Sequence, residues 1–119
     1  MQITRYKGQP LPFTIKFNGN PLTPYGKNYD DIQEVSINFK IDLENDSDNK
    51  YLEHLKSSGG VIVDPGNNSF TFVPKPGDYR NMEKGSYKIV LAVRVTGFQE
   101  MIELSNEHSL KLIGDSQRK

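Results

Sequence analysis

The sequence has 119 residues, which is the usual length of a single domain. Its 15 basic and 15 acidic residues give no net charge, and the two signs nearly balance in each half of the chain, which excludes the basic surface typical of nucleic-acid binding. Cysteine is absent, which excludes disulfides, thiolate metal sites and cysteine nucleophiles.

The residue usage indicates strands and turns rather than helices. Alanine occurs once, whereas glycine and asparagine occur ten times each and proline seven times, and turns favour these three residue types. The first predicted strand is Phe13–Phe17, where apolar and polar residues alternate before the hairpin turn Asn18-Gly19. The next is Glu34–Leu43, in which five apolar residues alternate with five polar ones. We expect its polar face, which includes Ser36 and Asn38, to contact solvent.

The segment Asn49–Ser57 departs from this alternation. Its apolar residues stand at helical spacing, and Asp48 before it and Gly59 after it are suited to begin and end a helix. We therefore predict one short helix or a pair of turns, with an apolar side formed by Tyr51, Leu52 and Leu55.

The second half of the chain predicts further strands. A hairpin is expected from Val61 to Val73, with a five-residue turn centred on Gly66. The strand Tyr87–Thr96 has one apolar face, and its second face is half apolar because of Val90 and Ala92. That second face is either an interface or the side covered by a second layer of the same domain.

Two closing strands complete the predicted set. They are Phe98–Leu104 and Leu110–Ile113, with turns at Gly97 and at Ser105-Asn106. Residues 1–113 are then a single domain, and Gly114–Lys119 is a polar tail that we expect to be frayed.

About seven strands, one short helix or turn segment and no repeats favour an all-β fold, an antiparallel immunoglobulin-like β-sandwich. The turn into the strand that begins at Tyr87 carries a signature of that class. It places Met82 and Gly85 shortly before the tyrosine. Immunoglobulin-like sandwiches have a tyrosine here whose hydroxyl bonds to the backbone a few residues upstream. We predict the same hydrogen bond for Tyr87.

Catalytic motifs are missing from the sequence. The two histidines, His54 and His108, stand in no metal-binding or nucleophilic spacing, and we interpret them as solvated loop residues. No glycine-rich phosphate loop is present. We expect no enzymatic activity and no cofactor.

One acidic segment has the alternating oxygen ligands that calcium prefers. Counted from Asp42, however, the third position is Glu44 and the sixth is Ser47 instead of glycine, although Glu53 stands at the twelfth. The preceding residues also predict a strand where the calcium-loop motif has a helix. We therefore expect a solvated acidic loop with no bound metal.

The exposed aromatic residues are expected in the segment between residues 20 and 31, which is rich in proline and glycine. Tyr25 and Tyr29 are the rings predicted to face solvent there, whereas the phenylalanines of the strands fit the core pattern. Together with Val90 and Ala92, these two tyrosines are our candidate interface residues.

Several segments, in chain order, resemble those of a known class of module. They are Phe17–Thr23, Val35–Leu43, Gly60–Val63, Phe70–Phe72 and the Met82-x-x-Gly85-x-Tyr87 start of a strand that ends at Gly97. This order resembles the small immunoglobulin-like β-sandwich modules in virion proteins of tailed bacteriophages, such as the N-terminal domain of baseplate upper proteins.

The resemblance implies a non-enzymatic structural component of a phage virion, either a capsid decoration protein or a tail or baseplate module. It implies assembly in the host cytoplasm and other virion proteins as partners, namely major capsid, portal-proximal or tail proteins, with a homo-oligomer also possible. Balanced charge suits the packing of many copies. No apolar run is long enough to span a membrane and the N-terminus lacks a signal-peptide pattern, so we expect neither membrane nor nucleic acid as partner.

Two other classes of function remain as alternatives. One is a carbohydrate-binding or adhesion β-sandwich module, which the absence of tryptophan disfavours. The other is a small sandwich hydrolase or metalloenzyme, which the lack of any ligand or nucleophile spacing disfavours.

Overall fold

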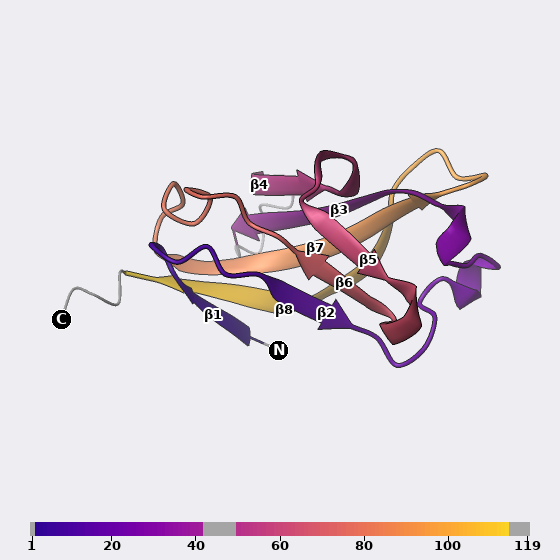
Figure 1. The fold of residues 1–119 in the computed structure, drawn as a ribbon, viewed down its shortest axis with the longest axis horizontal. Coiled ribbons are helices and arrows are strands. Elements are labelled where there is room, and N and C mark those ends of the chain that lie inside the picture. Colours follow the sequence, from indigo (N-terminus) through magenta and orange to yellow (C-terminus); the bar gives the residue numbers. More distant parts are fainter. Residues whose placement is uncertain (1, 42–49, 115–119) are drawn as a thin grey trace.

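The computed structural model describes residues 2–41 and 50–114, and its strands form two sheets that pack face to face (Figure 1). One sheet has five strands in the order β1-β8-β7-β3-β4, and the other has three in the order β2-β6-β5. The strands are β1 (Gln2–Tyr6), β2 (Phe13–Lys16), β3 (Ile32–Ile41), β4 (Lys50–Leu55), β5 (Val61–Asp64), β6 (Ser69–Phe72), β7 (Gly85–Val95) and β8 (Ile102–Ile113).

The β1–β8 pair is parallel, so the five-stranded sheet is mixed and the prediction of a purely antiparallel fold is wrong. Sequence patterning also missed β1, whose Ile3 is buried opposite Leu110. After β1 the chain crosses to β2 in the other sheet. No hairpin therefore forces β1 to run antiparallel to its neighbour.

Four of the predicted segments form strands close to their expected bounds, namely β2, β3, β7 and the β5–β6 hairpin. The hairpin turn contains a 3-10 helix, η4 (Pro65–Asn67), followed by Asn68 in the left-handed region at φ 50°. The two predicted closing strands are instead one long strand, β8, because the chain continues through Ser105 with an irregular register opposite Ile89–Ala92.

The predicted helix at Asn49–Ser57 is wrong. Residues 50–55 form β4, an edge strand paired antiparallel with β3, and only the next three residues form a 3-10 helix, η3 (Lys56–Ser58). Pairing with β3 satisfies the backbone of this segment better than an isolated short helix, which is marginal in water. Gly59 does end η3, in the left-handed conformation at φ 84°. Asp48 lies outside the described residues.

The core lies between the two sheets and contains a cluster of phenylalanine rings from both. Phe72 of β6 stacks on Phe13 of β2, with ring centroids 5.1 Å apart, and meets Phe39 of β3 edge-on at the same distance. Phe70 is also fully buried, whereas Phe17 is half-buried against the core. The prediction that the strand phenylalanines form the core is therefore confirmed for four of these five residues.

The outer face of the five-stranded sheet is less polar and less exposed than its sequence indicates. Ser36 and Asn38 are buried, so the prediction of a solvated face on β3 is wrong at these two positions. They pair with Ala92 and Val90 of β7, which are only 7% and 8% exposed. Because β3 and β7 are inner strands, each of these short side chains lies between two neighbouring strands, which leaves little of it accessible.

The predicted tyrosine hydrogen bond is confirmed. The Tyr87 hydroxyl, at the start of β7, donates to the backbone carbonyl of Glu83 at 2.6 Å, and the ring is buried. The bond spans the turn that leads into β7 and fixes the direction in which the chain enters the sheet.

Tyr87→Phe is expected to lower the free energy of unfolding by about 1 kcal/mol, because it removes this hydrogen bond and keeps the ring in place. Urea denaturation of the two proteins measures the difference. Tyr6→Phe, a substitution on the half-buried ring of edge strand β1, serves as the control for loss of a hydroxyl. Unfolding midpoints that agree within error for Tyr87→Phe and wild type would show that the bond adds nothing to stability.

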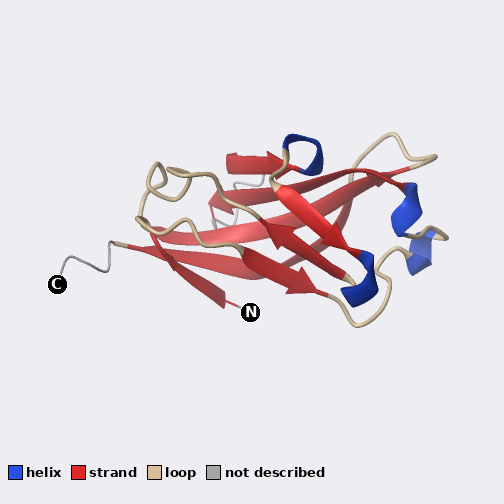
Figure 2. Cartoon of the chain, viewed as in Figure 1, coloured by secondary structure: helices blue, strands red, loops and turns tan. Residues whose placement is uncertain are grey.

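The helical residues of the described chain are 3-10 turns of three residues each (Figure 2). Besides η3 and η4 they are η1 (Thr23–Tyr25) and η2 (Tyr29–Asp31), which follow β2. In residues 2–41 and 50–114 there is no helix with the length and apolar character needed to cross a membrane.

Candidate functional site

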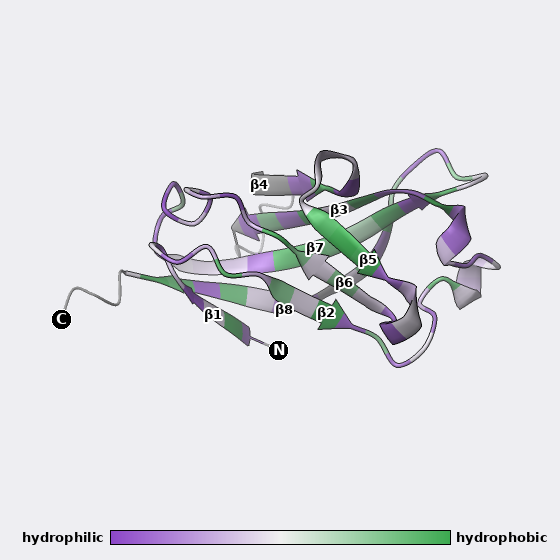
Figure 3. Cartoon of the chain, viewed as in Figure 1, coloured by the Kyte–Doolittle hydropathy of each residue, from purple (hydrophilic) through white to green (hydrophobic). Residues whose placement is uncertain are grey.

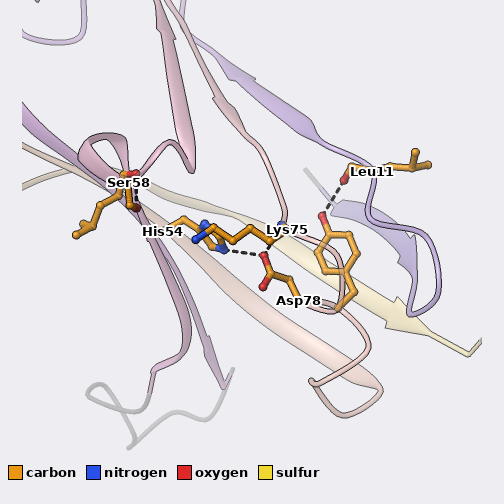
Figure 4. A network of polar contacts seen from close by, with 7 residues as sticks. Leu11, His54, Ser58, Lys75 and Asp78 are labelled. Atoms are coloured by element: carbon orange, nitrogen blue, oxygen red, sulfur yellow. Dashed lines mark hydrogen bonds and ion pairs between the residues drawn. The ribbon is translucent and has the colours of Figure 1, made fainter.

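A buried polar contact joins β4 to the loop that follows β6. The Nε2 atom of His54 lies 2.7 Å from Oδ2 of Asp78, and both side chains are largely buried (Figure 4). The prediction that His54 is a solvated loop residue is therefore wrong. His54 pairs with the core residue Ile37 in the β3–β4 register, which directs its side chain toward the core.

The surroundings of His54 are closely packed. Its imidazole meets the Phe72 ring edge-on, with ring centroids 4.8 Å apart. A Cβ atom added to Gly60 would lie 2.7 Å from Cβ and 2.8 Å from Cγ of His54, and Nδ1 would be closer still. Only glycine therefore fits at position 60. The Asp78 carboxylate also accepts a hydrogen bond from the backbone N–H of Lys75 at 2.6 Å.

This geometry favours a structural role for the His54–Asp78 pair. Ser58, the hydroxyl-bearing residue drawn nearby in Figure 4, donates to the carbonyl oxygen of Leu55 at 3.1 Å and not to the imidazole. Within the described ranges there is also no group of three or more histidine, aspartate or glutamate side chains placed to hold a metal ion. The pair thus ties β4 and η3 to the loop around Asp78.

The second histidine is not part of this network. His108 lies on β8 and its Nδ1 is 3.2 Å from the Ser105 hydroxyl. Two strands of the five-stranded sheet separate β8 from β4, so His54 and His108 do not meet. His108 is half-buried in a strand, which makes the loop prediction wrong here too, and burial lowers the pKa of its imidazole.

Tyr79 occupies the same loop as Asp78 and is almost completely buried. Its hydroxyl donates to the carbonyl oxygen of Leu11 at 2.9 Å, which connects the β6–β7 loop to the segment before β2 (Figure 4). Burial raises the pKa of Tyr79 to about 12, and the positive charge of Arg5 partly opposes the shift.

A raised pKa in the folded state predicts alkaline destabilisation. The stability that Tyr79 contributes is fully present below pH 10, the usual pKa of tyrosine, and is lost as the pH rises from 10 to about 12. The loss amounts to about 2–3 kcal/mol. Tyr79→Phe lacks both this dependence and the hydrogen bond to the Leu11 carbonyl. Wild type should therefore have the higher free energy of unfolding at pH 7, and the two free energies should converge and cross between pH 10 and 12. Parallel urea titrations across this range measure the difference, and a constant gap would contradict the assignment.

The acidic segment proposed as a solvated loop, Asp42–Glu53, falls mostly outside the described residues. Only its last four residues are described, as part of the backbone of β4. The polar tail beyond Gly114 is likewise outside the described residues.

Exposed apolar side chains gather on two loops at one end of the two sheets. Tyr25 on η1 and Phe98 on the β7–β8 turn are 40% and 37% exposed, and their rings meet edge-on with centroids 6.1 Å apart. Met101, three residues further along the same turn, is 37% exposed. The paired rings of Tyr25 and Phe98, together with Met101 on the same turn as Phe98, are here called the apolar end surface.

Lys27 adds a charge beside this surface, since its Nζ would lie 3.5 Å from a Cβ added at Gly97. The loops are held in place by the Thr96 N–H, which donates to the carbonyl oxygen of Asp31 at 2.9 Å. Sequence reasoning identified Tyr25 but assigned Phe98 to a strand and missed Met101. Gly97 was the residue that predicted this turn, and the turn places Phe98 at the surface.

The other candidate interface residues are placed differently. Tyr29 was expected to be exposed but is half-buried, because its ring packs on Phe70 and its hydroxyl donates to the Asn68 side chain at 3.0 Å. Burial raises the pKa of this hydroxyl. Val90 and Ala92 are buried on the five-stranded sheet, away from the loops that carry Tyr25.

The buried pair of His54 and Asp78 stabilises the fold, whereas the apolar end surface is accessible to a partner. Comparison with known proteins adds no relative: no family model matches this chain, and no curated protein matches it.

Proposed function

We propose that this chain is a non-enzymatic structural module of a tailed-phage virion, either a capsid decoration protein or a tail or baseplate component, and that it acts through protein–protein contacts. The apolar end surface is the observation that carries this proposal. It gathers Tyr25, Phe98 and Met101, each more than a third exposed, on loops at one end of a compact two-sheet scaffold.

The finer fold assignment, an immunoglobulin-like sandwich, is part of the same proposal. Two facing sheets and the bond from Tyr87 to Glu83 support it, since that bond is a recurrent feature of such sandwiches. The parallel β1–β8 pair is the feature in which this chain differs from the antiparallel arrangement expected for it.

The chemistry of the apolar end surface suits a protein partner. Tyrosine, phenylalanine and methionine are enriched at protein interfaces, where large apolar side chains in the centre of a contact contribute most of the binding energy. Lys27 beside the surface offers a polar rim. The absence of net charge lets many copies pack without mutual repulsion.

Sedimentation of particles tests the proposal. A tagged chain is produced in cells that assemble the phage, and purified particles are probed for it by mass spectrometry. We expect wild type in the particle fraction and Phe98→Ser reduced there at least about tenfold, because aromatic anchors of this kind contribute about 2 kcal/mol or more. Leu11→Ser is the matched control, since Leu11 is also exposed but lies on the segment between β1 and β2, which carries neither Tyr25 nor Phe98. Absence of wild type from the particles contradicts the proposal.

A carbohydrate-binding module is the second candidate, because exposed aromatic rings also stack on sugars. The rings of Tyr25 and Phe98 are nearly perpendicular, at 88°, so they do not form one flat platform, which favours the protein partner. A glycan array probed with wild type and Phe98→Ser separates the two. Binding that depends on Phe98, together with absence from particles, would select the carbohydrate function.

A further inference from the structure

Asn18 and Gly19 form the single Asn-Gly step of the sequence. The sequence predicts a hairpin turn here, but β2 pairs with β6, and the next strand in the chain, β3, belongs to the other sheet. The hairpin prediction is therefore wrong. The step lies instead in an exposed bend on the loop between β2 and η1, which runs along the outside of the fold (Figure 1) and is largely hydrophilic (Figure 3).

The Asn-Gly step is held by no contact in the part of the chain that the structure describes. Neither the Asn18 side chain nor the Gly19 N–H has a hydrogen-bond partner there. A Cβ atom built on Gly19 would meet no atom within 4 Å, and φ at this residue is 121°, a conformation that glycine adopts far more readily than other residues. The backbone nitrogen of Gly19 can therefore approach Cγ of Asn18 without breaking a hydrogen bond or meeting a side chain.

We propose that Asn18 is a site of spontaneous deamidation, with water as the co-reactant. The Gly19 nitrogen loses its proton and forms a bond to Cγ of Asn18, and the Cγ–Nδ2 bond breaks to release ammonia, which leaves a cyclic succinimide. Water then adds to either carbonyl carbon of the ring, and the bond from that carbon to the ring nitrogen breaks. The product is aspartate, or isoaspartate when the chain continues through the former side-chain carbon. In total one water is consumed and one ammonia is released, with no change in oxidation state.

Other asparagines of the chain lack this combination of features. Asn20 precedes Pro21, whose nitrogen carries no hydrogen and cannot close the ring. The Asn28 side chain accepts a hydrogen bond from a backbone N–H of η2 at 3.0 Å, and the Asn67 side chain donates to a carboxylate at 2.7 Å. These three residues are therefore comparison sites within the same molecule.

The modification falls between two fixed points of the loop. Before the step, the Phe17 N–H donates to the carbonyl oxygen of Asn68 at 2.9 Å, and after it, the Asn20 side chain accepts from the Leu22 N–H at 2.9 Å. Isoaspartate lengthens the backbone between these points by one carbon atom. Either product adds one negative charge to a chain whose formal net charge is zero. This chemistry does not depend on the virion proposal.

Peptide mapping of the aged protein tests this inference. Purified wild type and a synthetic peptide of residues 15–22 are incubated in warm, mildly alkaline buffer. Mass spectrometry with electron-transfer fragmentation then separates isoaspartate from aspartate at each site. We expect Asn18 to give both products at least about tenfold faster than Asn20, Asn28 or Asn67 react, and within about tenfold of its rate in the peptide.

Two variants test the ring closure itself. Asn18→Gln keeps an exposed amide but needs a larger ring, so ammonia release at position 18 should slow at least about tenfold. Gly19→Ala places a Cβ beside the attacking nitrogen and should slow the reaction in the same direction. The inference is overturned if Asn18 stays unmodified in the folded protein after the peptide has reacted, or if aspartate forms without isoaspartate. It is also overturned if Asn18→Gln releases ammonia from position 18 as fast as wild type.

Discussion

Gly60→Ala is expected to lower the free energy of unfolding by about 3 kcal/mol, because it adds volume to a closely packed site. A Cβ at position 60 would lie within 2.8 Å of several His54 atoms, at a point where the imidazole is held by Asp78 on one side and by Phe72 on the other. The ring cannot withdraw without losing one of these contacts. Urea denaturation followed by circular dichroism measures the loss.

Two further variants identify the cause. Gly66→Ala is the matched control, since a Cβ there meets only Asp64, at an ordinary contact distance of 3.7 Å, and we expect a change within about 0.5 kcal/mol. In a His54→Ala background the contacts with Cγ and Nδ1 are gone and only the contact with Cβ of residue 54 remains, so Gly60→Ala should cost about 1 kcal/mol less than in wild type. Equal costs in the two backgrounds would show that the ring is not what excludes a side chain at position 60.

Asp78→Ala is expected to lower the free energy of unfolding by about 2–3 kcal/mol. It removes the acceptor for His54 and for the Lys75 N–H together, and it leaves a buried imidazole without its partner. Thermal and urea denaturation at neutral pH measure the change.

Asp64→Ala supplies the comparison for Asp78→Ala. The Asp64 carboxylate accepts a hydrogen bond from the Asn67 side chain at 2.7 Å, but the pair lies on an exposed turn. Exposed polar pairs contribute little, so we expect a loss below about 1 kcal/mol. Similar losses for the two substitutions would show that burial adds nothing to the His54–Asp78 contact.

The sequence pattern predicts the elements of this fold that depend on neighbouring residues alone. The alternation in β3 and β7 reflects a strand with one face on the core, and the glycine at position 97 predicts a turn that the structure contains. The hydrogen bond of Tyr87 was predictable because it spans only four residues.

Features that depend on contacts distant in sequence escaped prediction. The apolar residues in the segment 50–55 have helical spacing, but the segment forms a strand because it pairs with β3. The spacing within the segment carries no information about that pairing. The parallel pair of β1 with β8 joins the two ends of the described chain. Ser36 and Asn38 look like solvated residues in the sequence, but their strand is an inner one, which only the strand order reveals.

The candidate sites divide in the same way. Tyr25 was identifiable from a loop rich in proline and glycine, and it is exposed. Its contact with Phe98 joins residues 73 positions apart, and His54 lies 24 positions from Asp78, so no sequence spacing relates either pair. The first contact joins two connecting loops and the second joins β4 to a loop, so both arise only once the sheets have packed.

Photo-crosslinking from the apolar end surface tests most directly the proposal that this surface contacts a protein of the virion. A photoreactive phenylalanine analogue replaces Phe98, and purified particles are irradiated and analysed by mass spectrometry. We predict a covalent adduct between position 98 and a protein of the particle, with no such adduct when the analogue replaces Leu11 on the segment between β1 and β2. Particles that contain the chain but yield no adduct from position 98, or that yield the same adduct from position 11, would contradict the proposed contact.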